Sequence, residues 1–188
     1  MRNKSSRLSY FWKTCLGLAC ALLFSACDVT FINPLPDSLK VERDERLSGK
    51  WTTRDEEGHL GYAEFVSRGE SEFDVHFEAG DPNVVFRVSS AKIDGSTFMI
   101  IKTTDAAKKE GYFLAKYVIK GDKLKVWLLD EKKVRQAVRD GRLKGEIGKE
   151  TYAGVTITDS AEKILAYLKT AGDDAFKVFA AFEKVAGK

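Results

Sequence analysis

Between residues 47 and 130 the chain repeats one pattern, in which short segments rich in Val, Ile, Phe, Tyr and Trp alternate with turn residues about every ten positions. This spacing is typical of an antiparallel meander, because each short strand must turn back on the one before it. The pattern predicts seven consecutive strands, near 49–54, 61–67, 71–79, 84–92, 97–104, 112–120 and 123–129.

Two connections in this region have the composition of tight hairpin turns. Asp94-Gly95 and Gly121-Asp122 each separate two strand-like segments by two residues. Primed turns require positive φ angles, which Gly and Asp adopt more readily than most residues. A slightly longer hairpin is expected at Arg68-Gly69-Glu70.

The residues from Glu72 to Glu78 alternate between apolar and polar side chains, which indicates one buried and one solvated strand face. The segments 112–119 and 124–129 are instead apolar on both faces, so we expect the sheet interior to cover one face and a helix the other. The side chains expected to point inward are Phe73, Val75, Phe77, Phe113, Tyr117 and Trp127.

Helices are predicted in the C-terminal third. One runs from Glu131 to Asp140 with Asp130 as N-cap, and a second starts at Asp159, with Glu162 completing a capping box, and stops at Gly172. A further helix is expected from Asp173, with an apolar stripe formed by Phe176, Phe179 and Phe182. A last strand is predicted within 151–158. The expected fold class is mainly β: an antiparallel meander forming a barrel or a strongly curled sheet of about eight strands, with C-terminal α-helices packed on it.

The N-terminus has the three-part organisation of a secretory signal. A basic start containing Arg2, Lys4, Arg7 and Lys13 precedes an apolar stretch from residue 14 to residue 24 and the small residues 25 and 26. That apolar stretch has about eleven residues, whereas a membrane-spanning helix needs roughly twenty. A removed signal is therefore favoured over a permanent span.

The ending Phe24-Ser25-Ala26-Cys27 resembles the lipobox of bacterial lipoproteins. The resemblance implies cleavage after Ala26, a diacylglyceryl thioether on Cys27 and further acylation of the new amino group by a chain such as palmitate. Two or more acyl chains anchor a protein stably, whereas one is marginal. The alternatives are an ordinary secretory cleavage that leaves Cys27 as a free thiol, and an uncleaved anchor.

The residue after the cysteine bears on location. In enterobacterial lipoproteins, Asp directly after the lipidated Cys is a signal for retention in the inner membrane, so Asp28 favours that membrane, with the outer membrane as the alternative. In either case the resemblance implies a protein of the cell envelope that faces the periplasm.

Removal of residues 1–26 changes what the composition implies. The whole chain has 31 Lys+Arg and 28 Asp+Glu, and the removed segment holds four basic and no acidic residues, which leaves 27 against 28. A nearly neutral mature chain gives no reason to expect nucleic acid as a partner. Cys15 and Cys20 are also removed, so a disulfide within the mature chain is excluded. The remaining 162 residues suit one domain, expected at 47–188 after a Pro-containing tether at 27–46.

The Gly49-Lys50-Trp51 stretch at the start of the first strand resembles the Gly-x-Trp motif of lipocalins and related calycin barrels. In that family the Trp closes the base of an eight-stranded barrel whose interior binds a small apolar molecule. The alternatives are that Trp51 is an ordinary core aromatic and that the sheet is curled over the helices without closing.

Few residues suggest catalysis. The two histidines are His59, in a polar loop, and His76, which shares one strand face with Asp74 and Glu78. Asp74, His76 and Glu78 are weak candidates for a metal site, and the solvated face of an amphipathic strand is the favoured explanation for them. No Gly-x-Ser-x-Gly, phosphate-binding loop or dinucleotide fingerprint occurs, so we expect neither an enzyme nor a cofactor.

A basic cluster lies between residues 130 and 150, where nearby acidic residues reduce the net charge to +2. It is either a solvated helix with scattered ion pairs or a surface for anionic headgroups or an acidic envelope polymer. Its members are Lys132, Lys133, Arg135, Arg139, Arg142, Lys144 and Lys149.

Two classes of function are consistent with the sequence. The first is a lipid-anchored β domain that holds a small apolar ligand or lipid in its interior. The second is a structural or interaction lipoprotein, such as an inhibitor or an assembly accessory, that docks an envelope partner by its surface. The interior of the domain distinguishes the two, because a carrier needs a continuous pocket there.

Overall fold

The structure is a computed structural model that describes residues 29–33, 35–36, 38–54, 58, 60–77, 85–103, 111–148 and 154–186. Within these residues the chain is mainly β, with two α-helices and two short 3-10 helices. The elements are β1 (Val29–Phe31), β2 (Val41–Glu42), η1 (Glu45–Leu47), β3 (Gly49–Arg54), β4 (Leu60–Arg68), β5 (Glu72–Phe77), β6 (Phe86–Ile93), β7 (Ser96–Thr103), β8 (Phe113–Lys120), β9 (Lys123–Leu129), α2 (Glu131–Arg139), β10 (Gly145–Ile147), β11 (Val155–Ile157), α3 (Ala161–Ala171), η2 (Asp173–Ala175) and β12 (Phe176–Lys184).

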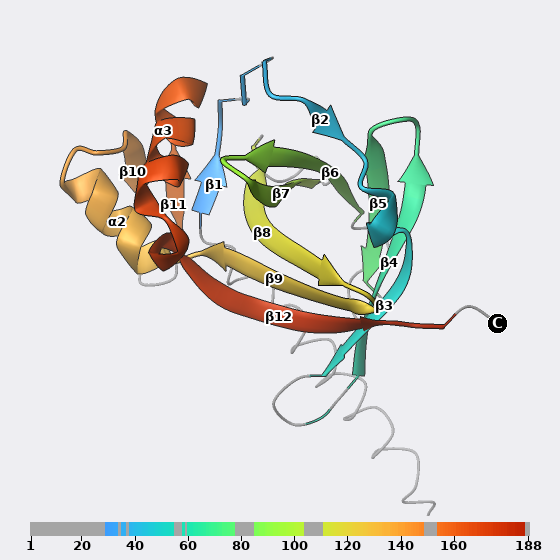
Figure 1. Cartoon of the computed structure of the whole chain (residues 1–188). Helices are drawn as coiled ribbons and strands as arrows, with labels where there is room; N and C mark the ends of the chain where they lie inside the picture. The colour runs from blue at the N-terminus through green and yellow to red at the C-terminus, as the bar shows by residue number, and fades with distance from the viewer. Residues whose placement is uncertain are drawn as a thin grey trace, which may run out of the picture.

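Eight strands form a closed antiparallel barrel, seen in Figure 1 as a ring of curved ribbons. From β3 to β9 each strand pairs with the next in the chain, β12 lies between β9 and β3, and β2 pairs with one edge of β6. The expected fold class is confirmed, and the barrel is the alternative that the structure adopts over an open curled sheet.

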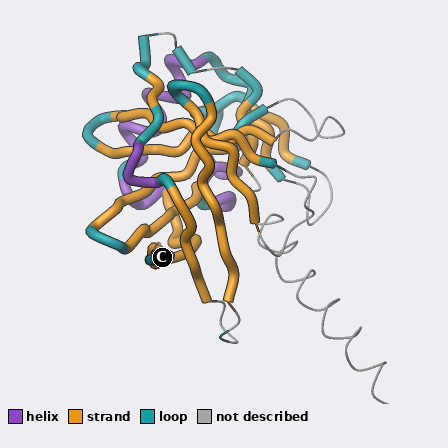
Figure 2. Tube along the Cα trace, turned by 90° about the vertical axis from the view of Figure 1, so that its right-hand side faces the viewer, coloured by secondary structure: helices purple, strands orange, loops and turns teal. Residues whose placement is uncertain are grey.

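Tight turns join the strands at one end of the barrel. Asp94 and Gly95 have φ angles of +49° and +76°, and Gly121 has a φ of +60°, as the sequence predicts for two-residue hairpins. Because neighbouring strands are antiparallel, these turns and the β4–β5 turn lie at the same end, which we call the turn end. The C-terminal ends of β3, β5 and β7 lie at the opposite end, which we call the loop end. There β3 and β4 extend beyond the other strands (Figures 1 and 2).

Apolar side chains fill the inside of the barrel. Phe73, Val75 and Tyr117 belong to this cluster and are at most 1% exposed, as predicted. The expectation for Trp127 is wrong, since this residue lies opposite Lys116 and Val178 on the outer face. The buried members of the interior cluster are Leu47, Trp51, Ala63, Phe65, Phe73, Val75, Phe86, Val88, Met99, Ala115, Tyr117, Leu124, Val126, Leu128 and Phe182.

A second apolar cluster lies outside the barrel. Phe98, Ile100 and Leu114 point outward from β7 and β8 and pack with a three-stranded sheet of order β1-β11-β10 and with the two helices. Figure 1 shows this layer on one side of the barrel, with β1 between α3 and the barrel strands. The first half of β8 is therefore covered on both faces, as predicted, but β1 contacts its outer face directly, where a helix was expected.

The helix predicted at 131–140 is α2. The Asp130 side chain caps it by accepting a hydrogen bond from the backbone N–H of Lys132 at 2.9 Å, and Val134 and Ala137 are fully buried. The predicted end of α3 at Gly172 is also confirmed. Its start is different, because Ser160 is the N-cap and the Asp159 carboxylate accepts from the backbone N–H of Lys144 at 2.7 Å.

The third predicted helix does not form. Residues 173–175 make the 3-10 helix η2, and the following residues make β12, which completes the barrel. A β-bulge lies between Val178 and Ala180. This irregularity shifts the strand alternation, so Phe179 and Phe182 both pack on the interior cluster despite a spacing of three residues, which is also the spacing of a helical stripe.

The segment after Cys27 is not a free tether. Residues 29–31 form β1, in which Val29 and Phe31 are buried, and residues 41–47 contribute β2 and η1. The sequence pattern missed β1 because its partners, β11 and Tyr112, are distant in the chain. No helix among the described residues combines the length and hydropathy needed to cross a bilayer.

Candidate functional site

The 3-10 helix η1 covers the turn end of the barrel. Leu47 and Trp51 are both fully buried there, and the indole N–H of Trp51 donates to the backbone carbonyl of Leu47 at 2.7 Å. Gly49 has a φ of +101°, a conformation that side chains rarely tolerate, so the change of direction from η1 into β3 depends on this glycine. Gly49 and Trp51 thus occupy the end of the barrel at which the lipocalin resemblance places its closing motif.

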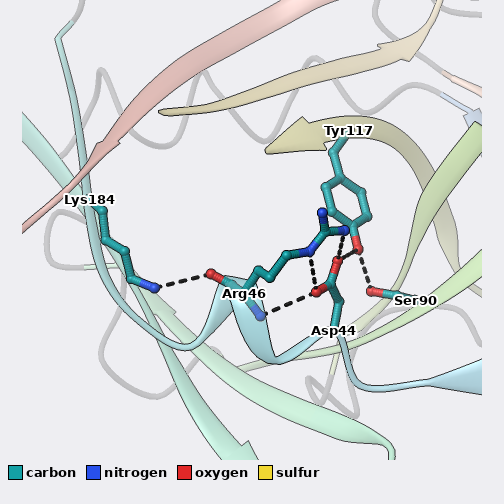
Figure 3. Close-up of polar contacts among 5 residues, drawn as sticks. All are labelled: Asp44, Arg46, Ser90, Tyr117 and Lys184. Atoms are coloured by element: carbon teal, nitrogen blue, oxygen red, sulfur yellow. Dashed lines mark hydrogen bonds and ion pairs between the residues drawn. The ribbon is translucent and has the colours of Figure 1, made fainter. Parts of the chain in front are cut away.

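Lys184, at the end of β12, lies at the same turn end, next to Trp51. Its Nζ is 5.2 Å from the centre of the Trp51 ring. The same ammonium donates to the Arg46 carbonyl oxygen at 3.1 Å (Figure 3). The contact joins the last strand to η1. The sequence pattern does not indicate a role for Lys184, because it predicts a helix for this segment.

A polar network lies at the turn end, next to η1 and on the inner faces of β6 and β8. The Tyr117 hydroxyl donates to the Asp44 carboxylate at 2.8 Å and is hydrogen-bonded to the Ser90 hydroxyl at 2.9 Å. The Arg46 guanidinium donates to both carboxylate oxygens of Asp44, at 2.9 and 2.6 Å (Figure 3). No local sequence pattern indicates this network, because its members come together only in the closed barrel.

The network sets the protonation of its members. Burial alone would raise the pKa of Asp44, but hydrogen bonds from Arg46 and Tyr117 outweigh it, and the pKa lies below its ordinary value. Burial raises the pKa of Tyr117, so the phenol stays protonated at neutral pH. A charged carboxylate and a neutral phenol fixed to each other fit a structural role at the base of the barrel.

A polar hollow of about 420 Å³ adjoins this network. Arg43 pairs with Glu45 at 2.5 Å and Glu42 pairs with Lys40 at 2.9 Å, so the charges around it are largely satisfied by each other. The hollow does not suit an apolar ligand. Its lining residues are Glu42, Arg43, Asp44, Glu45, Arg46, Ser90, Ala91, Lys92 and Thr97.

At the loop end the interior cluster finishes in half-buried apolar side chains. Phe77 and Ile101 pack on the cluster without being fully covered, and Phe113 lies directly opposite Ile101 on the neighbouring strand. Directly opposed residues share a face of a sheet, so Phe113 also faces the interior. We call Phe77, Ile101 and Phe113 the apolar rim. It offers partly exposed aromatic and aliphatic surface to an apolar group.

The outer face of β8, β9 and β12 carries a second exposed apolar surface. Val178 is 57% exposed and Val118 is 38% exposed, and the half-buried Trp127 lies opposite Val178. The Lys125 ammonium is 5.1 Å from the centre of the Trp127 ring. We call Val118, Trp127 and Val178 the outer patch.

The weak metal candidates are not assembled into a site by the described residues. Asp74 and His76 lie on the outer face of β5, and Asp74 is paired with Arg68 at 2.9 Å. Glu78 and His59 lie outside the described residues. Across the described ranges, no group of three or more His, Cys, Asp or Glu side chains is arranged to hold a metal ion. Cys27 and Asp28 also lie outside them.

The basic cluster maps to α2 and the residues after it, apart from Lys149, which is not described. Arg135 contacts Glu131, and Arg142 pairs with Asp140 at 3.2 Å. The exposed cations along this element are Lys132, Lys133, Arg139, Arg142 and Lys144.

Comparisons with protein-family models, with characterised proteins and with solved structures found no match to this chain.

Proposed function

We propose that this protein is a non-catalytic lipoprotein of the bacterial cell envelope, held in the membrane through Cys27 and facing the periplasm, whose barrel binds a small apolar ligand or lipid at its loop end. The lipobox-like sequence before Cys27 supports the anchor. The closed barrel is an architecture compatible with ligand binding.

The observation that carries the proposal is the difference between the two ends of the barrel. At the turn end, Trp51 and the η1 residue Leu47 are fully buried. At the loop end, the same apolar interior finishes in the half-buried side chains of the apolar rim. An apolar ligand that covers this rim removes aromatic surface from water, and each square ångström covered contributes about 25 cal/mol.

The packing of the interior limits how far a ligand can reach into the barrel from the loop end. Trp51, Phe73 and Tyr117 occupy the turn-end half of the barrel with at most 1% of their surface exposed. The ligand therefore covers the apolar rim at the loop end and does not reach Trp51. The end of an acyl chain fits this description better than a bulky polycyclic molecule.

The polar groups at the turn end support the non-catalytic part of the proposal. Asp44, Ser90 and Tyr117 are engaged with one another or with Arg46. The pKa of Asp44 is lowered and that of Tyr117 is raised, so neither changes protonation near neutral pH.

Native mass spectrometry of the full protein purified from membranes tests the ligand. We expect a co-purifying apolar molecule that is lost on denaturation, in addition to the acyl mass that remains covalently attached. Observation of the acylated polypeptide alone, together with failure of a fluorescent fatty acid to bind, would contradict ligand binding.

The outer patch favours a second function, the docking of an envelope partner. Val118, Trp127 and Val178 expose apolar surface on adjacent strands, which is the arrangement found at interaction sites. A photo-crosslinking residue at Val178 should give a discrete adduct in cells, whereas one at Val66, an equally apolar and 46% exposed position on β4, should not. Identical adduct patterns at both positions would exclude docking by this patch.

A further inference from the structure

Val29 is the first residue that the structure describes after the proposed lipid attachment site, and it is already part of the folded domain. Its side chain is 6% exposed, and it pairs with Val155 of β11. Two peptide units separate Val29 from Cys27, so their Cα atoms lie within about 7 Å of each other. A lipid on Cys27 is therefore bound almost directly to the edge of the domain.

The strand that follows the attachment site is firmly held. Phe31 is 1% exposed, and its backbone exchanges two 2.9 Å hydrogen bonds with Tyr112. The Asn33 side chain also donates to the carbonyl oxygens of Thr158 and Asp159, both at 2.9 Å. Release of β1 would expose two core side chains, and the burial of each stabilises the fold by about 1.5–3 kcal/mol. Release of β1 to lengthen the connection to the lipid would therefore cost several kcal/mol of folding free energy.

The dimensions of a bilayer show that so short a connection brings the domain into contact with the headgroups. The polar headgroup layer on one side of a bilayer is about 5–7 Å thick, and a diacylglyceryl group places its sulfur at the level of the glycerol. The remaining reach of about 7 Å brings Val29 only to the outer surface of the headgroups.

We propose that the domain rests directly on the bilayer, with the edge formed by β1, β11 and β10 against the phospholipid headgroups. The inference depends on the lipidation of Cys27, which belongs to the proposed function. It identifies the partner of this surface as the membrane to which the protein is anchored.

The charge next to this edge suits an anionic bilayer. α2 packs against β10 and β11, and the exposed residues from Lys132 to Glu146 include five cations against two anions, Asp140 and Glu146. A basic residue close to an anionic membrane surface contributes about 1 kcal/mol. The basic cluster would thus add an electrostatic attraction to the covalent anchor.

The test uses the lipidated full protein in vesicles of phosphatidylethanolamine and phosphatidylglycerol that carry a contact-range quencher on their headgroups. Once Cys27 is acylated and residues 1–26 are removed, an introduced cysteine is the only free thiol for a fluorescent label. Glu146→Cys is the test position, because Glu146 lies in register with Thr156 and Thr30, roughly 10 Å from β1. Asp122→Cys is the matched control, an acidic residue about ten residues along the barrel from Tyr112, or roughly 30 Å.

We expect strong quenching at Glu146→Cys and weak quenching at Asp122→Cys. Insertion of eight Gly/Ser residues between Asp28 and Val29, a linker of about 15 Å, should relieve the quenching at Glu146→Cys. An acylated protein that shows equal quenching at both positions, or none at Glu146→Cys, would overturn the inference and leave the anchor intact. Absence of the diacylglyceryl mass on Cys27 would overturn the anchor and the inference together.

Discussion

Lys184 lies across the face of Trp51, with its Nζ 5.2 Å from the ring centre and hydrogen-bonded to the Arg46 carbonyl oxygen at 3.1 Å. The last barrel strand and the 3-10 helix at its base are thus connected through one ammonium group. Lys184→Met keeps most of the apolar stem and removes the charge. We expect the free energy of unfolding, measured by urea titration, to fall by about 1–2 kcal/mol.

The control for this variant is Lys120→Met. Lys120 is an exposed lysine at the end of β8, beside the same set of turns. Surface substitutions of this kind usually change stability by about 0.5 kcal/mol or less. Equal losses for Lys184→Met and Lys120→Met would show that the contact with Trp51 contributes nothing specific.

Tyr117→Phe tests the polar network at the base. It removes the hydroxyl that bonds Asp44 and Ser90 and leaves those two groups partly unsatisfied in a water-poor site. Loss of such a partner costs about 1–3 kcal/mol. The matched variant Tyr62→Phe removes the hydroxyl of a tyrosine on the outer face of β4 and keeps the ring that faces Lys50. Thermal or urea unfolding should show a loss for Tyr117→Phe and almost none for Tyr62→Phe.

Asp44 also predicts how stability depends on pH. Its pKa in the folded protein is lower than in the unfolded chain, so the unfolded chain binds the proton more readily. The stability that Asp44 contributes is therefore fully present above its ordinary pKa and is lost as the pH falls below about 4. Asp44→Asn should be less stable at neutral pH and should show a shallower decline in acid. Parallel urea midpoints for the two proteins across this range would contradict the assignment.

The strand β1 provides a test of the boundary of the domain. Phe31 is 1% exposed and stacks on Tyr112 with ring centres 5.4 Å apart, whereas its neighbour Ile32 is 39% exposed. Phe31→Ala should cost about 3–5 kcal/mol, and Ile32→Ala no more than about 0.5 kcal/mol. Similar small effects for both variants would mean that residues 29–33 behave as the tether expected from the sequence.

Much of the barrel could be predicted because its signals are local. Strands β3 to β9 are joined by short connections, and turns such as Asp94-Gly95 show their φ requirement in their residue types. The helix α2 was found for the same reason, since Asp130 and Gly141 mark its two ends. Turn and cap residues of this kind identify a strand or helix even when its pairing partners are unknown.

The elements that were missed depend on distant partners. β1 is a three-residue strand whose pairing residues begin at Val155, and no pattern within three residues reveals that. The sequence pattern predicts a helix at β12 because Phe176, Phe179 and Phe182 are three residues apart, and only the bulge allows Phe179 and Phe182 to share the inner face of a strand at that spacing. Because a helix is predicted there, the contact between Lys184 and Trp51 at the turn end is not predicted either. Asp44 and Tyr117 were missed because their association requires the closed barrel.

Asp28 predicts the membrane in which the protein resides, on the enterobacterial rule that the sequence suggests. Fractionation of cell membranes should place the native protein with the inner membrane and Asp28→Ser with the outer membrane. The physical basis is a change in recognition of the residue beside the lipid and not in folding, so both proteins should have the same unfolding midpoint. An outer-membrane location for both would contradict the sorting role of Asp28.

Phe113→Glu tests whether the apolar rim takes up the ligand. The substitution places a carboxylate on the inner face of β8 at the loop end, where its desolvation under an apolar ligand costs several kcal/mol. Val118→Glu places the same charge on the outer face of the same strand, at a position that is already 38% exposed. Binding of a fluorescent fatty acid to the full protein should weaken at least tenfold in Phe113→Glu and stay unchanged in Val118→Glu, with circular dichroism showing that both variants are folded. If Val118→Glu lost binding while Phe113→Glu kept it, the apolar probe would be bound at the outer patch, and the barrel end would have no role in ligand recognition.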